Sequence, residues 1–202
     1  MRLAHLASLA VLVPALTLAG CSGAESGPEF SIPDELRSHA PTETASGYEH
    51  AAAPSSYESF SGDHFEISIP QGWELRAEED TGSSRRFAWA PPEDAGETAI
   101  IGVVVDLAAQ EVLTESYLLE MGKTVTSTNE VSREMLHWPG AERAVRIIWE
   151  ELAPGSSDPL RYEQLMVQVE PGLIINVVGA ADADDFDDSG VPDGMRSVTV
   201  RE

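Results

Sequence analysis

Phe65-Glu-Ile-Ser-Ile-Pro-Gln-Gly-Trp73 is the stretch of this sequence that decides the fold. Apolar and polar residues alternate strictly from Phe65 to Ile69, as they do in a strand with one buried face. Pro70 fixes its own φ and Gly72 tolerates a positive φ, so a turn is expected directly after the alternation. The stretch therefore predicts a β-strand that ends in a tight turn.

A second run, Thr-Ala-Ile-Ile-Gly-Val-Val-Val-Asp-Leu at 98–107, is continuous and rich in β-branched residues. A run without alternation is typical of a central strand that is covered on both faces. Short turns separate the strands along the chain, which favours an antiparallel sheet. We predict the other strands at 86–90, 131–136, 144–152, 162–170 and 173–178, with a last short strand at Val198 and Val200.

The alternation within these strands also predicts which side chains face the core. We expect buried side chains at Ile67, Val104, Ile147 and Val167, and less buried ones at Glu66, Arg146 and Gln168.

Residues 114–125 have a different period. Leu118, Met121 and Val125 follow one another at i, i+3 and i+7, and Thr114 is a suitable N-cap residue. The pattern predicts an amphipathic helix that packs on the sheet. The tail from 181 to 202 is acidic at first, and we expect it to be partly helical.

The beginning of the chain predicts an export signal. A positively charged start is followed by an apolar run that is too short to span a bilayer, and the run ends at Leu18-Ala19-Gly20-Cys21. These four residues resemble a bacterial lipobox. The resemblance implies that lipoprotein signal peptidase recognises Leu18, Ala19 and Gly20, and that Cys21 carries acyl chains such as palmitate. The alternative is an ordinary signal peptide in which Cys21 is incidental.

Composition divides the rest of the chain into a tether and a domain. Residues 21–60 are rich in Gly, Ser, Pro, Ala, Thr and Glu and show no lasting apolar period, as expected of a flexible linker. Periodic strands begin after residue 60. The predicted organisation is therefore a signal peptide at 1–20, a lipidated cysteine and tether at 21–60, and one globular domain at 61–202.

The charge of the chain limits its partners. A formal net charge of −23 argues against binding to nucleic acid and against electrostatic adhesion to anionic lipid. Membrane attachment is then expected through acyl chains on Cys21, at the outer face of the cell membrane. Because Cys21 is the single cysteine, no disulfide is expected to stabilise the domain.

Several segments together resemble the PsbP/Mog1-like fold and, within it, the LpqN-type lipoproteins of actinobacteria. They are Phe65–Trp73, the strand that ends Val103-Val104-Val105, the helix around Glu115–Leu118, and the closing segments Asp185–Asp187 and Met195–Val198. The resemblance implies an antiparallel sheet with helices on both faces, an α/β/α sandwich of the α+β class. It also implies that the protein acts by binding, as PsbP does on a photosystem and Mog1 on a small GTPase. The residues Gly190, Pro192 and Gly194 depart from the pattern, since they interrupt the second flanking helix.

No catalytic constellation is evident in the sequence. The histidines are scattered, there is no Gly-x-Ser-x-Gly elbow, and there is no glycine-rich phosphate loop. We interpret the four tryptophans, Trp73, Trp89, Trp138 and Trp149, as core residues and not as the lining of a ligand pocket. We therefore expect neither an enzyme nor a cofactor.

The segment Asp182–Asp193 packs six aspartates into twelve residues. Its start imitates an EF-hand loop, but Arg196 stands where the bidentate Glu would be. We interpret it as a solvated acidic loop in which Phe186 alone turns into the core, and we expect no metal site. If the loop has a role, contact with a basic partner through Asp184, Asp185, Asp187 and Asp188 is favoured.

The sequence as a whole favours a lipid-anchored adaptor of the cell envelope that binds another envelope component and does not catalyse a reaction. The alternative is a carrier of a small apolar or lipid ligand, held in a pocket between sheet and helix.

Overall fold

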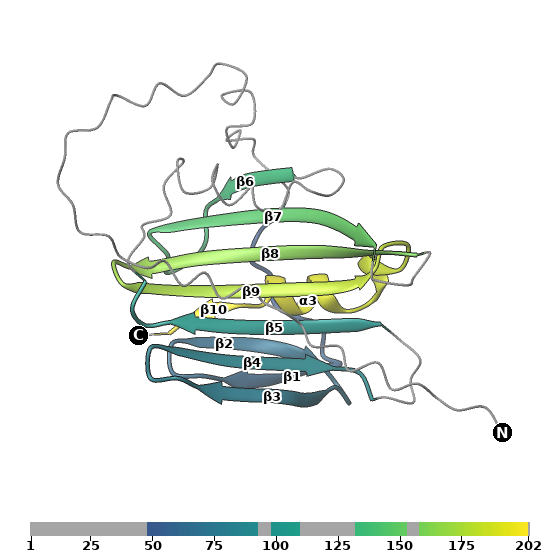
Figure 1. The fold of residues 1–202 in the computed structure, drawn as a ribbon, viewed down its shortest axis with the longest axis horizontal. Coiled ribbons are helices and arrows are strands. Elements are labelled where there is room, and N and C mark those ends of the chain that lie inside the picture. The colour runs from purple at the N-terminus through teal and green to yellow at the C-terminus, as the bar shows by residue number, and fades with distance from the viewer. Residues whose placement is uncertain (1–47, 93–97, 110–131, 153–157, 202) are drawn as a thin grey trace, which may run out of the picture. The chain divides into compact units, whose positions relative to one another are not determined.

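The computed structural model describes residues 48–92, 98–109, 132–152 and 158–201. The signal peptide, most of the predicted tether and the predicted helix at 114–125 lie outside these ranges. Within them, the chain forms two antiparallel sheets (Figure 1). The smaller sheet has the strand order β1-β2-β10, and the larger has the order β3-β4-β5-β9-β8-β7-β6.

The strands of the smaller sheet are β1 (Tyr57–Ser61), β2 (Phe65–Pro70) and β10 (Thr199–Val200). Those of the larger sheet are β3 (Glu74–Asp80), β4 (Ser84–Ala90), β5 (Ala99–Asp106), β6 (Ser132–Leu136), β7 (Arg143–Leu152), β8 (Pro159–Glu170) and β9 (Leu173–Asp182). The two described helical segments are a 3₁₀ turn, η1 (Phe186–Asp188), and a short α-helix, α3 (Val191–Arg196).

The predicted strand and turn at Phe65–Trp73 are confirmed. The strand is β2, and the N–H of Trp73 donates to the carbonyl oxygen of Pro70 at 3.1 Å, which closes the turn. Gly72 has a φ of 88°, which only glycine adopts without strain. β1 pairs with β2, so the expected boundary between residues 60 and 61 falls inside a strand.

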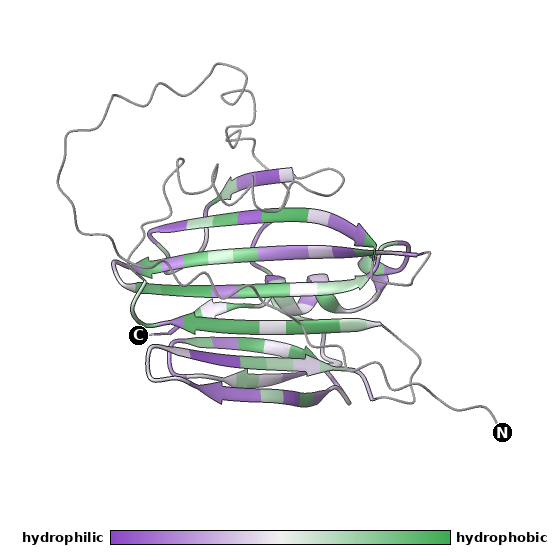
Figure 2. Cartoon of the chain, in the orientation of Figure 1, coloured by the Kyte–Doolittle hydropathy of each residue, from purple (hydrophilic) through white to green (hydrophobic). Residues whose placement is uncertain are grey.

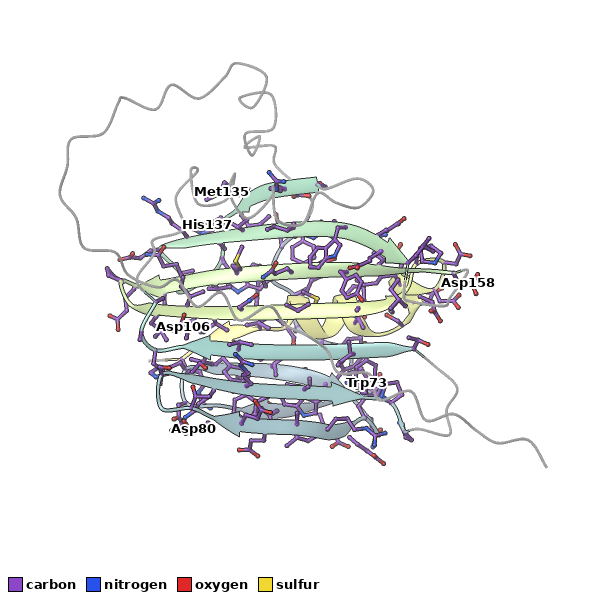
Figure 3. All side chains as sticks on the ribbon, in the orientation of Figure 1. Trp73, Asp80, Asp106, Met135, His137 and Asp158 are labelled. Atoms are coloured by element: carbon purple, nitrogen blue, oxygen red, sulfur yellow. The ribbon has the colours of Figure 1, made fainter. Side chains whose placement is uncertain are left out.

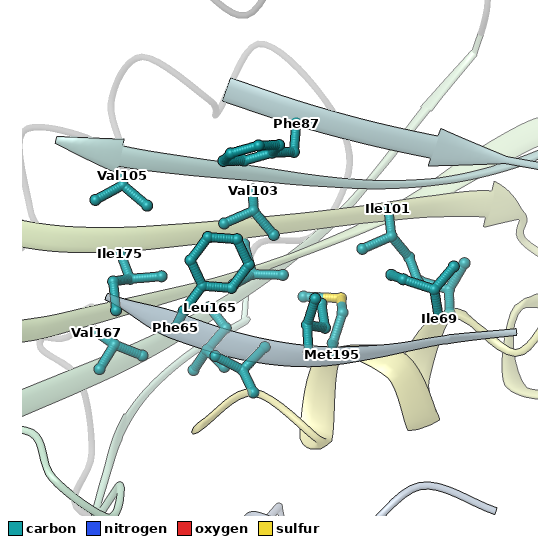
Figure 4. Close-up of a cluster of buried hydrophobic side chains, with 14 of the residues drawn as sticks. Phe65, Ile69, Phe87, Ile101, Val103, Val105, Leu165, Val167, Ile175 and Met195 are labelled. Atoms are coloured by element: carbon teal, nitrogen blue, oxygen red, sulfur yellow. The ribbon is translucent and has the colours of Figure 1, made fainter. Parts of the chain in front are cut away.

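The main core lies between the two sheets. We call the face of the larger sheet that meets the smaller sheet and α3 its inner face, and the opposite face its outer face. Side chains of β5, β9 and β8 meet those of β2 and α3 there, as Figure 4 shows. The strands in the middle of the larger sheet are the most apolar, whereas β3 at its edge is largely hydrophilic (Figure 2). This distribution explains why β3 is exposed along its whole length.

Glycines let α3 approach the inner face closely. A Cβ on Gly179 of β9 would lie 2.2 Å from Val191 Cγ1 and 2.5 Å from Met195 Sδ. A Cβ on Gly194 of α3 would lie 2.6 Å from Cδ1 of Ile101. The interface between α3 and the sheet is therefore filled by side chains, and a single added methyl group has no room in it.

The predicted α/β/α sandwich is wrong. The described residues are mostly strand, their single α-helix has six residues, and no helices flank both faces of the sheet. The inner face is covered mainly by a second sheet. The sequence did not separate these architectures, because the alternation at 65–69 fits a strand in the main sheet as well as one in a covering sheet. Of the partly helical tail that we expected, α3 is the part that forms.

The burial predictions are confirmed at Ile67, Ile147 and Val167, which have no exposed surface. They are wrong at two positions. Val104 is only half-buried, because Val103 and Val105 face the core instead. Gln168 is buried, and its amide nitrogen donates to Glu142 at 3.4 Å.

Ile147 belongs to a second apolar cluster, on the outer face. It packs there with Val145 and Met166, and Trp149 stacks on Tyr162 nearby with ring centroids 5.1 Å apart. Both faces of β7 therefore contribute buried side chains, Ala144 to the inner face and Val145 and Ile147 to the outer face. Among the described residues no helix is both long and apolar enough to cross a membrane.

Candidate functional site

The first described residues, 48–53, cross the inner side of the larger sheet before β1, and we call them the N-terminal strap. The end of α3 holds this strap. The N–H of Ala51 donates to the carbonyl oxygen of Arg196 at 3.0 Å, and Arg196 Nε donates to the carbonyl oxygen of Glu49 at 3.2 Å. Segments nearly 150 residues apart in sequence are thereby joined.

Tyr48 is the one strap side chain that is buried. Its ring stacks on Trp138, with the centroids 6.1 Å apart at an interplanar angle of 27°. The guanidinium carbon of Arg146 lies 4.0 Å from the ring centroid, and that of Arg196 lies 5.9 Å from it. Such cation–π contacts are each worth about 0.5–2 kcal/mol, and more as water is excluded. The Tyr48 hydroxyl lies close enough to Glu163 for the charge of that carboxylate to act on the phenol.

Arg146 and Glu163 form an ion pair beneath the Tyr48 ring. Nη2 of Arg146 donates to a carboxylate oxygen of Glu163 at 2.9 Å, and Nη1 donates to Glu134 at 3.3 Å. The side chain of Glu163 is 1% exposed and that of Arg146 is 14% exposed. A charge this deeply buried is tolerated only when it is paired, because removing it from water costs several kcal/mol.

Strand register brings these charges together. Arg146 of β7 pairs with Glu134 of β6 on one side and with Leu165 of β8 on the other. Glu163 lies two residues from Leu165 and thus points to the same face, diagonally opposite Arg146. Three neighbouring strands therefore each place one charged residue on the inner face, beyond the area that α3 and β2 cover.

The pKa values of Tyr48 and Arg146 are both shifted upward in this cluster. Burial first, and then the charge of Glu163, raise the pKa of Tyr48 above its ordinary value of 10.0, so the phenol stays protonated. Burial opposes the charge of Arg146, but the hydrogen bond and charge of Glu163 outweigh it and raise the pKa of Arg146. The cluster is thus a neutral phenol on a charged guanidinium, which suits it to binding.

Trp138 is held independently of the strap. Its indole Nε1 donates to the carbonyl oxygen of Val198 at 3.1 Å, and the residue is 2% exposed. His50 of the strap meets the indole edge-on, with centroids 5.8 Å apart. The predicted turn at 137–140 is confirmed, since Gly140 has a φ of 78° and the N–H of Ala141 donates to Trp138.

The acidic loop lies at the other end of the larger sheet. Asp158 precedes β8 at the end opposite to His137 (Figure 3), and the loop joins that end because the N–H of Ala183 donates to the carbonyl oxygen of Pro159 at 3.0 Å. Asp184, Asp185, Asp187 and Asp188 are all exposed.

Phe186 of this loop is buried, as predicted. The Arg161 guanidinium carbon lies 4.8 Å from the centroid of its ring. Across the described ranges, no three His, Cys, Asp or Glu side chains come together in a way that would hold a metal ion.

The predicted lipidation site, Cys21, and the residues Leu18, Ala19 and Gly20 before it lie outside the described residues. The buried cluster around Tyr48 was not predicted. A partial signal was available, because Arg146 and Glu163 are charged residues next to apolar stretches of β7 and β8, whereas Glu134 lies in a mostly polar strand. The sequence alone did not reveal that their registers match, nor that a residue of the predicted tether covers them.

The fold and the cluster define a domain of two antiparallel sheets in which a charged, aromatic site is covered by the chain's own N-terminal strap. The sequence matches no protein-family model and no curated protein. Solved structures that are similar to it include the following two. The Ran-binding protein Mog1p of Saccharomyces cerevisiae has a TM-score of 0.45 and 10% identity, over 74% of this chain and 96% of that chain. LpqN of Mycobacterium tuberculosis, described as involved in cell envelope biogenesis, has a TM-score of 0.41 and 13% identity, over 87% and 100%.

These are two of the proteins to which the sequence resemblance pointed. With TM-scores below 0.5 and identities of 13% or less, neither similarity carries a partner, an activity or a location over to this chain.

Proposed function

We propose that this protein is a lipid-anchored adaptor at the outer face of the cell membrane, of the LpqN type, which binds another envelope component and catalyses no reaction. The observation that carries the proposal is Leu18-Ala19-Gly20-Cys21 at the end of a short apolar run with a positive start. A cysteine in this position accepts acyl chains, and two chains suffice for stable anchoring. The net charge of −23 leaves acyl chains as the plausible means of attachment.

The packing of the domain supports surface binding over carriage of an apolar ligand. The alternative function needs a pocket between sheet and helix, and pockets for small molecules measure about 300–1,000 Å³. At the described helix, α3, the sheet has no room for one methyl group at Gly179 or Gly194. The second helix of that alternative, at 114–125, lies outside the described residues.

The acidic loop is the surface that we propose for a basic partner. Its four exposed aspartates lie at one end of the larger sheet. Trp138, on which Tyr48 of the strap stacks, lies at the opposite end. Like charges at this density attract a basic surface without needing fixed geometry.

Membrane fractionation with Cys21→Ala tests the anchor. Wild type should incorporate an alkyne-labelled palmitate and stay with membranes after a high-salt wash, whereas the variant should incorporate none. A variant that is unlabelled yet still pelleted after the wash would show that the attachment lies elsewhere.

Photo-crosslinking in cells tests the adaptor surface. A crosslinking residue at Asp187 should give one recurring adduct, and a matched residue at exposed Glu78 of β3 should not. The adduct should weaken when Asp184, Asp185 and Asp188 are changed to Asn. Identical adducts from both positions would contradict a specific surface.

A further inference from the structure

The Tyr48 ring occupies a slot that is built from separate elements of the domain. We call this the tyrosine slot and define it by Trp138, Arg146, Glu163 and Arg196. Trp138 forms one wall, the two guanidinium groups face the ring, and the carboxylate of Glu163 acts on the hydroxyl through its charge. The aromatic ring therefore has an aromatic partner and two cationic partners in the slot.

Two parts of the slot are held in place by contacts that do not involve the strap. Trp138 is fixed by its hydrogen bond to Val198, and the Arg146–Glu163 ion pair is fixed by strand register. Arg196 ends the helix α3, in which Val191, Gly194 and Met195 are buried, but its guanidinium donates to the strap at Glu49. Groups that keep their geometry without an occupant lose little entropy when they bind one.

The strap, in contrast, is held as a bound peptide is held. One side chain is inserted, and two hydrogen bonds involve the strap's main chain, at Glu49 and Ala51. Glu49 and Ala52 are exposed, so the strap adds little apolar burial beyond Tyr48. A single anchor side chain with main-chain hydrogen bonds is the usual way in which an extended segment is recognised.

We propose that the tyrosine slot is a docking site for an extended, tyrosine-bearing segment of a partner protein, and that the strap occupies it in cis as a competitor. The strap that occupies the slot indicates the chemistry of the partner. The partner's segment should carry a tyrosine, a main-chain carbonyl one residue later that accepts from Arg196, and a main-chain N–H three residues later that donates to Arg196. This rests on the proposed adaptor function and adds to it a second contact surface, separate from the acidic loop.

Because the strap belongs to the same chain as the slot, it sets the affinity that a partner needs in order to displace it. A segment tethered next to its site has an effective concentration in the millimolar range. A free peptide therefore competes poorly with wild type and well with a chain whose own anchor has been removed. The partner's segment would displace residues 48–53 and release the chain that precedes them.

The experiment uses the full chain in detergent, as wild type and as Tyr48→Ala, with a fluorescein-labelled peptide of residues 45–53, Ala-Ser-Gly-Tyr-Glu-His-Ala-Ala-Ala. Fluorescence anisotropy should show binding to Tyr48→Ala that is at least about tenfold tighter than to wild type. A peptide with Phe in place of Tyr should still bind, because its ring can make the same contacts with Trp138 and the two guanidinium groups. A peptide with Ala there should not bind.

A cooperatively melting Tyr48→Ala chain that binds no peptide, or that binds the Tyr and Ala peptides equally, overturns the proposal. If Tyr48→Ala does not fold, wild type replaces it, and it should bind the Tyr peptide more tightly than the Ala peptide; equal binding overturns the proposal. A concentration-dependent dimer of wild type that Tyr48→Ala abolishes would make a second copy the occupant and overturn the partner proposal. None of these outcomes depends on the lipid anchor, so failure here leaves the fractionation result standing.

Discussion

Gly179→Ala should destabilise the domain because the new methyl group would enter the space of α3. The added Cβ would lie 2.2 Å from Val191 Cγ1 and 2.5 Å from Met195 Sδ, and neither residue has exposed surface. Overpacking of this kind costs about 1–3 kcal/mol. Replacing glycine also restricts the unfolded chain, which returns about 0.4–1 kcal/mol. The net expectation is a loss of up to about 2.6 kcal/mol, or a fall in Tm of up to about 10 °C at the usual 2–4 °C per kcal/mol.

The matched control is Gly102→Ala on the neighbouring strand β5. Its Cβ would meet only the carbonyl oxygens of Phe87 and Val178, at 3.7 and 3.8 Å, which is ordinary contact. Here the unfolded-state effect acts alone, so stability should be unchanged or rise by up to about 1 kcal/mol. Urea denaturation followed by circular dichroism compares both variants with wild type, and an unchanged m-value confirms that the comparison is two-state.

A double variant identifies the atoms responsible. Val191→Ala removes the nearest of the two clashing groups, so Gly179→Ala with Val191→Ala should be less destabilised than the sum of the single changes. Equal stability of Gly179→Ala and Gly102→Ala would refute the claim that α3 is closely packed on the sheet. It would also revive a carrier function in that interface.

Five other variants test the buried cluster and the acidic loop. Arg146→Ala leaves Glu163 buried without its cation and should cost about 3–5 kcal/mol in urea denaturation, whereas Arg201→Ala, which removes an exposed ion pair, should cost about 0–1 kcal/mol. Because the folded pKa of Tyr48 is raised, the contribution of the phenol to stability is present below the unfolded pKa of 10.0 and is lost as pH rises above it. Tyr48→Phe should therefore lose less stability than wild type between pH 9 and 11. Equal losses would contradict the burial of the phenol. Changing the four exposed aspartates of the acidic loop to Asn should leave the Tm within a few degrees, with no calcium-dependent rise before or after the change, whereas Phe186→Ala should cost about 3–5 kcal/mol. A stoichiometric calcium site in calorimetry would overturn this interpretation of the loop.

The parts of the fold that could be predicted are those governed by local sequence. The alternation in β2, the β-branched run of β5 and the turn at Gly72 each carry their own signal, and the structure confirms them. Period-2 alternation gives a strand and its two faces, but it does not say which sheet the strand joins. Within β7, where both faces are buried, it also does not say which face meets the main core. For this reason the sequence did not reveal that a second sheet, and not a layer of helices, covers the inner face.

The candidate site depends on contacts across long stretches of sequence, and these are what a single sequence does not show. Tyr48 lies in a segment with the composition of a linker, and its partners come from β7, β8 and the end of α3. No local pattern relates residue 48 to residue 163. Arg146 and Glu163 were visible in the sequence as charged residues beside apolar stretches, but Glu134 was not. Their meaning depended on register, which a pattern of period 2 leaves open by any even number of residues.

The short helix α3 links the close packing of the core to the tyrosine slot. Val191 and Met195 pack on Gly179, and the next residue, Arg196, holds the strap through both its side chain and its carbonyl oxygen. Ser197 ties the same point to the smaller sheet, since its hydroxyl accepts from the N–H of Ser68 at 2.8 Å. A methyl group at Gly179 that pushes α3 away from the sheet should therefore move Arg196 and loosen the strap.

The labelled peptide of residues 45–53 measures this coupling. Under conditions in which all chains remain folded, it should bind Gly179→Ala several-fold more tightly than wild type or Gly102→Ala, because the competing strap is weakened. If Gly179→Ala is destabilised as expected but binds the peptide no better than the control, the helix does not transmit the displacement. The core and the slot would then be independent, and partner binding at the slot would depend on the strap contacts alone.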